Sequence, residues 1–501
     1  MLTALTRKMT LLALAILASQ VLLGLLVWGT DWPLGIPGEW TWQRVEKASF
    51  PWVEAAIITV GFALAAFLVW LCDWHLAASP LRWLLLVLIL AFGTWVDFNL
   101  MYMGSLGAYE PVFAVIDPYT GGYLLESYQV DNVGEYLRSY HLRLAKDADR
   151  CNHLDVHPPG NILFAKMARR IPFPAGLQDF MFMPDMRKLM LNVYAPALRQ
   201  LHLGESHLRE AEKVVLCFCI LATVARFLIF LSLLLVLPRN LPNAGLVAAL
   251  LAFALGGQIL FLGHFDALMF FLGACCLFNL ALLQRFPRAW LPCCLIMGAL
   301  LATGVFFSLA FAVLVPGVLL FFFCRYRRRE AWQHSLMLLL GGLVWVAGAE
   351  IMQVRILQMV FYCARNNARF FLEAGRDGFW PPANFLDLLL FEGTVFVFPL
   401  LLALPGWKKL GWRKDWRLSP SRSWVFAWAA VILFLLFSSF SKGEMGRLLL
   451  FIFPFIAFLG CILPAEIKLN WRAYRLWALL PLSSAVFIML LRCQLKLIIF
   501  F

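Results

Sequence analysis

Apolar runs of about twenty residues recur through this chain of 501 residues, and each is long enough to cross a bilayer as a helix. A backbone inside hydrocarbon must satisfy its own hydrogen bonds, so such runs fold as helices. Charged residues make up only 14% of the chain, whereas a soluble domain carries about 25%. The sequence therefore predicts an all-α polytopic membrane protein and excludes an ordinary soluble enzyme.

About thirteen transmembrane helices are expected. The first is a retained span, because its apolar run is longer than the core of a cleaved signal peptide. The domains expected are two N-terminal transmembrane helices (1–82), a larger transmembrane domain (83–492) and a short C-terminal tail (493–501). The thirteen spans are predicted at residues 9–29, 53–72, 83–101, 213–237, 244–262, 266–284, 289–305, 307–324, 333–354, 386–404, 424–441, 447–463 and 474–492.

The basic residues orient these spans. With the N-terminus in the cytoplasm, the cytoplasmic segments hold nineteen Lys and Arg residues and the short external segments hold ten. Membrane proteins show the same excess of Lys and Arg in their cytoplasmic loops. Because this rule holds for short loops, the long segment 102–212 is not counted. The same excess of basic residues accounts for the net charge of +13, so a nucleic-acid-binding function is not needed to explain it. No nucleic-acid-binding module appears in the sequence.

The long external segment contains the stretch DVHPPGNILFAK. Its two prolines push His157 into an extended conformation, and Gly160 lets the chain turn closely into a helix. That helix is amphipathic, and it is expected to lie in the membrane interface with a basic face towards lipid phosphate. The basic residues are Lys166, Arg169 and Arg170. The alternative is a plain loop-to-helix junction whose cations reach the membrane surface.

Asp155 stands two residues before His157, and the two side chains could orient each other, or hold a sugar hydroxyl or a metal. Two further external turns carry ionisable residues. The turn GHFDAL contains His264 and Asp266. Such residues at the membrane boundary usually face a cavity, although Asp266 also suits a helix N-cap.

The turn SKGEMGR opens a late span. Glu444 and Arg447 are three residues apart and can pair on one helical face. An arginine at a helix start opposes the helix dipole. Arg447 therefore indicates an anionic partner, with a simple interfacial arginine as the alternative.

Two of these motifs resemble the GT-C glycosyltransferases, in particular the bacterial relatives of the dolichol-phosphate-mannose protein mannosyltransferases. DVHPPG with its amphipathic helix lies in the long first external segment, where this family has an H-P-P-L or H-P-P-G element. GEMGR followed by LLLFIFP is similar to the family's late external turn. Two spans precede the family's usual first span, so residues 83–492 would form the GT-C-like catalytic domain.

The resemblance implies an integral membrane enzyme, active on the external face of a bacterial plasma membrane. It would move a sugar, with inversion, from a polyprenyl-phosphate donor to a lipid, glycan or protein acceptor. Family members have an Asp-Glu or Asp-x-Tyr element at the catalytic site, and this chain has no Asp-Glu pair between 95 and 155. Glu126 is the candidate base at the expected distance before HPPG, with Asp117 and Asp97 as alternatives.

The implied site has three groups of residues. The catalytic group comprises Glu126, Asp117 and His157; the donor-phosphate group comprises Lys166, Arg169, Arg170 and Arg447; the remaining site residues are Asp155, His264, Asp266 and Glu444. The sequence indicates no particular cofactor, and a divalent metal stays open although no Cys/His cluster has metal-site spacing. The partners implied are the lipid donor and membrane lipids, while the oligomeric state is not predicted.

Two other classes of function stay open at this point. A transporter, lipid flippase or polysaccharide export component would carry ionisable or helix-breaking positions deep in several spans. Arg226 is the clearest charge within a predicted span, and the other notable polar residues cluster outside. A non-catalytic membrane scaffold is the third reading.

Overall fold

The structure is a computed structural model. It describes residues 2–37, 40–44, 52–77, 79–104, 106–117, 122–146, 153–237, 241–253, 256–260, 262–373, 379–403, 420–438 and 450–495. Within these ranges the chain is helical apart from turns and one antiparallel pair of two-residue strands, β1 (Gly35–Ile36) and β2 (Trp40–Thr41). The expectation of an all-α polytopic architecture is confirmed at this level.

Short helices fill most of the segment 102–212 that is predicted to be external, and the longest helices lie outside it or begin at its end. In chain order they are α1 (Leu2–Gly29), α2 (Trp52–Trp70), α3 (Leu81–Met101), α4 (Tyr109–Ile116), α5 (Tyr123–Gln129), α6 (Val133–Lys146), α7 (Gly160–Ala168), α8 (Ala175–Phe182), α9 (Pro184–Val193), α10 (Ala195–Gln200), α11 (Glu205–Val236), α12 (Ala244–Phe253), α13 (Gly256–Leu260), α14 (Asp266–Arg285), α15 (Trp290–Phe307), α16 (Leu314–Arg325), α17 (Arg328–Ile351), α18 (Ile356–Glu373), α19 (Pro381–Glu392), α20 (Thr394–Ala403), α21 (Pro420–Phe437), α23 (Phe453–Glu466) and α24 (Trp471–Gln494). A π-helical turn, Leu71–His75, extends α2, and 3-10 turns occur at His153–Val156, Pro287–Ala289 and Leu309–Val313.

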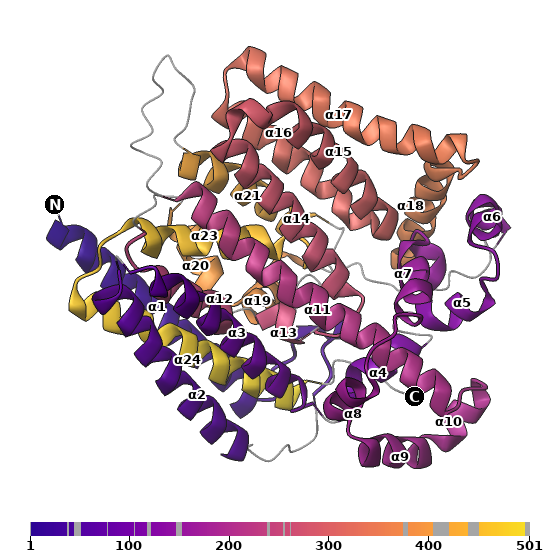
Figure 1. Cartoon of the computed structure of the whole chain (residues 1–501), viewed down its shortest axis with the longest axis horizontal. Coiled ribbons are helices and arrows are strands. Elements are labelled where there is room, and N and C mark those ends of the chain that lie inside the picture. The colour runs from indigo at the N-terminus through magenta and orange to yellow at the C-terminus, as the bar shows by residue number, and fades with distance from the viewer. Residues whose placement is uncertain are drawn as a thin grey trace.

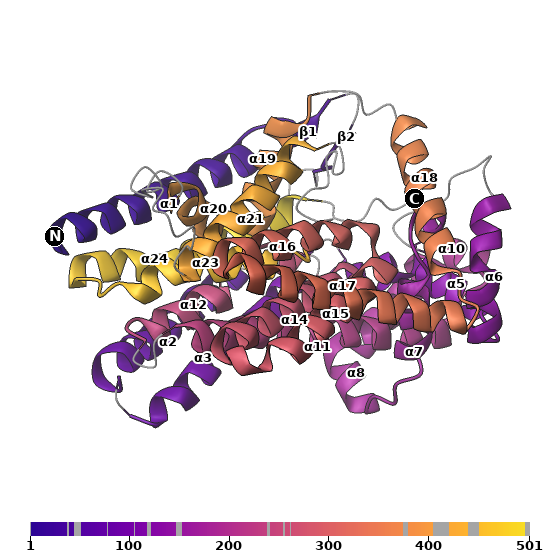
Figure 2. The ribbon, with the colours of Figure 1, turned by 90° about the horizontal axis from the view of Figure 1, so that it is seen from above.

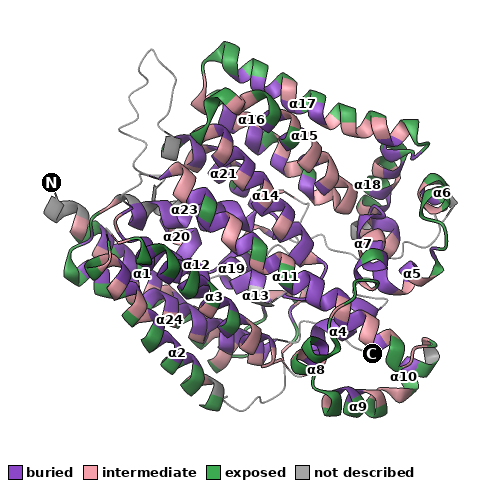
Figure 3. Ribbon diagram, in the orientation of Figure 1, coloured by how far each residue is buried: buried purple, intermediate pink, exposed green. Residues whose placement is uncertain are grey.

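Eight of the described helices are long and apolar enough to cross a membrane: α1, α2, α3, α11, α14, α15, α17 and α24. Their outward faces carry exposed apolar side chains, for example Leu22 at 66%, Val60 at 71% and Leu343 at 64% exposure (Figure 3). A water-soluble surface would not hold so many large apolar groups. The chain is therefore a multi-pass membrane protein, and the full count of thirteen spans stays a prediction.

The other predicted spans contain shorter or interrupted helices. Residues 244–262 hold two helices, α12 and α13, and residues 386–404 hold parts of α19 and α20. Gly393 separates α19 from α20 with a positive φ of 83°, a conformation that a side chain disfavours. The break at Gly393 coincides with Glu392 and Thr394, which interrupt an otherwise apolar run.

Helices from opposite ends of the chain lie side by side (Figure 1). The indole nitrogen of Trp477 in α24 donates to the Met9 carbonyl of α1 at 3.2 Å. Gln20 of α1 donates to the Ser484 hydroxyl of α24 at 2.6 Å. The N-terminal helices thus pack against the last helix, while the division into 1–82, 83–492 and 493–501 stays a prediction.

The short helices α4–α10 and the later helix α18 gather at the end of the molecule opposite the N-terminus (Figures 1 and 2). Arg492, near the end of α24, connects this group of short helices to the membrane helices through α4. Its Nη1 and Nη2 lie 2.9 and 2.8 Å from the two carboxylate oxygens of Glu110 in α4. Both side chains are buried, and the Nη1–Oε1 contact is a charge-assisted hydrogen bond, which is stronger than a neutral one.

Candidate functional site

Glu126 lies at the centre of a polar cluster in the external segment. It belongs to α5, which starts after Gly122 in the left-handed conformation, with φ of 62°. The carboxylate of Glu126 forms an ion pair with Arg143 and accepts a hydrogen bond from the Tyr136 hydroxyl at 3.2 Å. The side chain is only 8% exposed, so this carboxylate is nearly buried.

One face of α6 supplies the partners of this cluster. Tyr136, Tyr140 and Arg143 follow at positions i, i+4 and i+7, which share one side of a helix. The Tyr140 hydroxyl lies 3.2 Å from the Leu154 carbonyl and 3.1 Å from the His157 carbonyl. The helix thereby fixes the backbone that leads into HPPG, on both sides of Asp155.

Asp155 joins the cluster from the other side. It is 1% exposed, and its Oδ1 lies 4.0 Å from Nε of Arg143. Asn366 of α18 donates to the Asp155 carbonyl at 3.2 Å. Arg143 therefore holds two carboxylates, Glu126 and Asp155, near one another, and a helix more than two hundred residues later closes the cluster.

The charges of the cluster depend on one another. Burial alone would lower the pKa of Arg143, but the Glu126 carboxylate raises it above its usual value. Burial, together with the Glu126 charge, raises the pKa of Tyr136. Burial and the nearby Asp155 raise the pKa of the Cys363 thiol of α18 to about 12, so this cysteine is an inert packing group rather than a nucleophile.

The ring of Tyr123 lies between His157 and the GHFD turn and contacts rings of both edge to face. The Tyr123 ring lies 6.0 Å from the ring of His157 and 4.5 Å from the ring of Phe265, centre to centre. Phe265 is the residue between His264 and Asp266. The HPPG and GHFD segments, which are remote in sequence, therefore meet at one place.

The remaining candidates of this region vary in exposure. His264 is buried at 9% exposure, and Asp266 is half-buried as the first residue of α14. Asp117 is buried at the end of α4, where its carbonyl accepts the Gly122 amide at 2.9 Å. Glu444 and Arg447 lie outside the described residues.

The expectation of a free basic face on α7 is wrong for two of its three cations. Lys166 is buried and donates to the Val130 carbonyl. Burial, with Arg170 and Arg169 nearby, lowers the pKa of Lys166. Arg169 lies 4.4 Å above the Tyr128 ring and 3.0 Å from a carboxylate oxygen of Glu210.

Arg170, two residues after the end of α7, is exposed. The start of the helix is packed against the protein. A Cβ atom on Gly160 would lie 2.7 Å from the Phe306 carbonyl oxygen, so the start of α7 presses directly against the end of α15. Gly160 is needed for this close approach, and not only for the turn into the helix.

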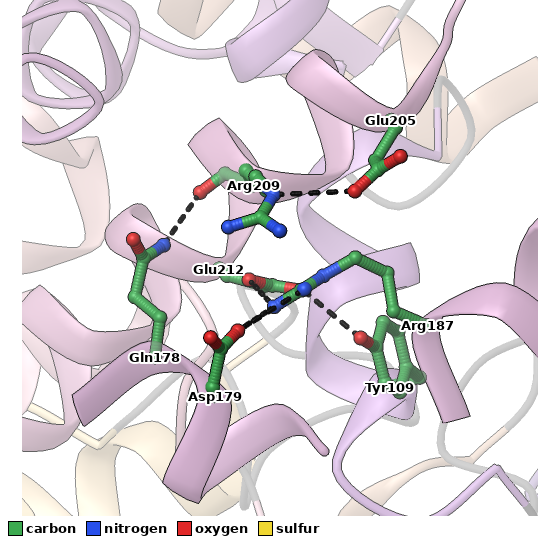
Figure 4. Close-up of polar contacts among 7 residues, drawn as sticks. All are labelled: Tyr109, Gln178, Asp179, Arg187, Glu205, Arg209 and Glu212. Carbon is green, nitrogen blue, oxygen red and sulfur yellow. Dashed lines mark hydrogen bonds and ion pairs between the residues drawn. The ribbon is translucent and has the colours of Figure 1, made fainter. Parts of the chain in front are cut away.

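A second buried network in the external segment was not predicted (Figure 4). Arg187 of α9 forms a forked pair with Glu212 of α11, with Nε–Oε1 at 2.7 Å and Nη2–Oε2 at 2.9 Å. Tyr109 of α4 donates to the same carboxylate at 2.9 Å. Asp179 of α8 accepts two hydrogen bonds from Arg187 at 3.2 Å. The network joins four helices, with Arg187 and Glu212 buried and Asp179 38% exposed at its edge, and it holds these helices together.

The described residues contain no group of three or more His, Cys, Asp or Glu side chains that could hold a metal ion. Comparison with protein-family models, with curated proteins and with solved structures finds no match. The functional argument therefore depends on the cluster around Arg143 and on the sequence motifs.

Proposed function

We propose that this chain is a membrane glycosyltransferase that moves a sugar from a polyprenyl-phosphate donor to an acceptor hydroxyl on the external face. The observation that carries the proposal is that Arg143 contacts both Glu126 and Asp155 beside the HPPG motif. An ionised base next to a lipid phosphate needs a neighbouring cation, and Arg143 provides one.

In the proposed reaction the acceptor oxygen attacks the anomeric carbon from the side opposite the phosphate. The bond between the anomeric carbon and the phosphate oxygen breaks, so the configuration inverts. Glu126 takes the proton of the acceptor hydroxyl as general base. Tyr136 and Arg143 hold the carboxylate in position, and the polyprenyl phosphate leaves with the electron pair.

The leaving phosphate needs positive charge that is not already occupied. Lys166 and Arg169 are engaged within the protein, so they support α7 rather than bind phosphate. Arg170 is exposed and keeps the predicted role, as does Arg447. His157, with His264 and Asp266 on the neighbouring turn, would line the sugar-binding side. The acceptor is a lipid, a glycan or a protein, because the proposed reaction requires only that it carry a hydroxyl group.

The test replaces the carboxylates one at a time. Glu126→Gln keeps the size of the side chain and removes the base, so transfer should fall by about 10²–10⁴-fold. Asp117→Asn and Asp97→Asn are the comparison variants. The assay follows a radiolabelled sugar from a synthetic polyprenyl phosphate into membranes that contain equal amounts of each variant.

The possible outcomes test two things separately: which residue is the base, and whether the chain is a glycosyltransferase. If Glu126→Gln transfers sugar at the wild-type rate while Asp117→Asn is inactive, the base is Asp117. If the wild type transfers no sugar from hexosyl or pentosyl donors, the enzyme proposal itself fails.

A specific observation favours transport as a second candidate. Asp97 of α3 and Arg226 of α11 form a fully buried ion pair, and Arg226 also donates to Gln258 of α13 at 2.7 Å. Ionisable groups buried among membrane helices mark substrate or ion pathways in many transporters. The transport candidate predicts that Asp97→Asn slows the movement of a fluorescent lipid-linked sugar from one leaflet to the other in proteoliposome membranes. The glycosyltransferase reading predicts no such movement in the wild type.

A further inference from the structure

Glu392 is a carboxylic acid buried inside the protein. It ends α19, within the run predicted to cross the membrane at 386–404, and it is 0% exposed. Within the part of the chain that the structure describes, neither of its carboxylate oxygens has a hydrogen-bond partner. The hydroxyl of Thr394, two residues later and also 0% exposed, has none either.

The helix end at Glu392 adds to the unfavourable environment of a negative charge. The last four carbonyl groups of any helix lack partners inside the helix, and they make the C-terminal end negative. At Gly393 the chain turns with a φ of 83° before α20 begins. A carboxylate at this point would face the negative end of its own helix dipole.

The elements around α19 supply no counter-charge among the described residues. Asp387, on the same helix, accepts a hydrogen bond from the Trp42 indole next to the β1–β2 pair at 2.7 Å. The neighbouring α13 presents Gln258, whose carbonyl is used by Arg226. The helix α20 has no titratable side chain, and Arg422 of α21 is exposed.

An ionised carboxylate that is buried without a partner is strongly disfavoured in an apolar interior. We propose that Glu392 is a proton-binding site inside the membrane domain, occupied at neutral pH. The protonated acid is neutral, and its O–H can be donated to one of the carbonyls at the end of α19. A proton thus removes the charge and supplies a donor to the helix end.

A metal cation would fit this place less well. A hard cation takes about six or more oxygen ligands, whereas among the described residues the unpaired side-chain oxygens next to this helix end are those of Glu392 and Thr394. The approach of α13 also leaves little room. A Cβ on Gly257 would lie 2.7 Å from the Phe391 carbonyl oxygen. The proposal does not depend on sugar transfer, because it concerns a site between membrane helices rather than the external cluster.

Infrared difference spectroscopy of the purified full chain tests the site directly. The comparison is wild type against Glu392→Gln at neutral pH, in the same detergent. We expect the difference spectrum to show loss of one protonated carboxylic-acid C=O band, which shifts in D₂O. Loss of a carboxylate band instead would show that Glu392 is ionised and would overturn the proposal. Asp387→Asn is the matched control on the same helix, and it should keep the acid band.

A second measurement covers the case in which Glu392→Gln does not fold. An apolar carbodiimide reacts with protonated carboxyl groups in apolar surroundings, so the wild-type chain should be modified at Glu392, as read by peptide mass spectrometry. Modification should be unaffected by sodium or potassium salts. Protection by either salt, or labelling of other carboxylates while Glu392 stays unmodified, would contradict a protonated Glu392.

Discussion

Buried ion pairs stabilise the external segment only while both partners are present. Arg187 and Glu212 are 2% and 0% exposed, and each satisfies the other in a forked geometry. Taking two such charges out of water is costly, and their mutual attraction offsets that cost when the geometry is good. The loss of one partner therefore matters more than the net contribution of the pair.

Arg187→Ala should destabilise the protein by about 3–5 kcal/mol, because Glu212 would be left buried without its cation. Thermal unfolding in detergent, followed by tryptophan fluorescence, measures the effect. Arg209→Ala is the matched control, since its partner Glu205 is 57% exposed and such a surface pair contributes less than about 1 kcal/mol. Equal losses in the two variants would show that the buried pair has no special role.

Between elements, α15 and α17 pack with their backbones in direct contact. A Cβ atom on Gly298 of α15 would lie 2.0 Å from the Leu338 carbonyl oxygen. A Cβ on Gly341 of α17 would lie 2.1 Å from the Leu295 carbonyl oxygen. Membrane helices use small residues in this way, because close van der Waals contact replaces the hydrophobic effect between them.

Gly341→Ala should cost about 1–3 kcal/mol, because a backbone carbonyl cannot rotate away from the added methyl group. Gly348→Ala is the control on the same helix, where an added Cβ meets no atom within 4 Å. Alanine is the better helix former by about 1 kcal/mol, so the control should be neutral or slightly stabilising. Thermal unfolding of both variants decides the point, and an unchanged midpoint for Gly341→Ala would contradict the close packing.

At the scale of the whole molecule, the proposed function requires the α4–α10 end to face the outside of the cell. The positively charged residues of the sequence predict this orientation. Arg170 in the external segment and Lys468 between α23 and α24 are both exposed, and they lie on opposite predicted sides of the membrane. They are therefore suitable positions for reporters of sidedness.

Cysteines introduced at 170 and at 468 should react differently with an impermeant thiol reagent in intact cells. Both cysteines are introduced into a variant that already carries Cys151→Ser. The cysteines among the described residues are buried or half-buried. We expect labelling of Arg170→Cys and no labelling of Lys468→Cys until the membrane is opened. Labelling of Lys468→Cys in intact cells would reverse the topology and remove the external site with it.

Parts of the external cluster could be found in the sequence. HPPG and GHFD were singled out by their composition, and the structure brings these segments together through Tyr123. Tyr136, Tyr140 and Arg143 also share a helical face, a signal that periodicity offers and that the prediction did not use. The break at Gly393 was missed because the span 386–404 was placed by its overall apolar content, although Glu392 and Thr394 stand on either side of the glycine.

The sequence by itself determined the helical membrane class, because backbone hydrogen bonds in lipid are satisfied locally and depend on the length of each apolar run. Tertiary packing alone decided the partners of the polar side chains. Glu126 meets Arg143 seventeen residues later, and Asp155 meets Asn366 across 211 residues. Packing also left Arg170 exposed while it buried Lys166. Such pairings depend on how helices lie against one another in space, which no local pattern of residues encodes.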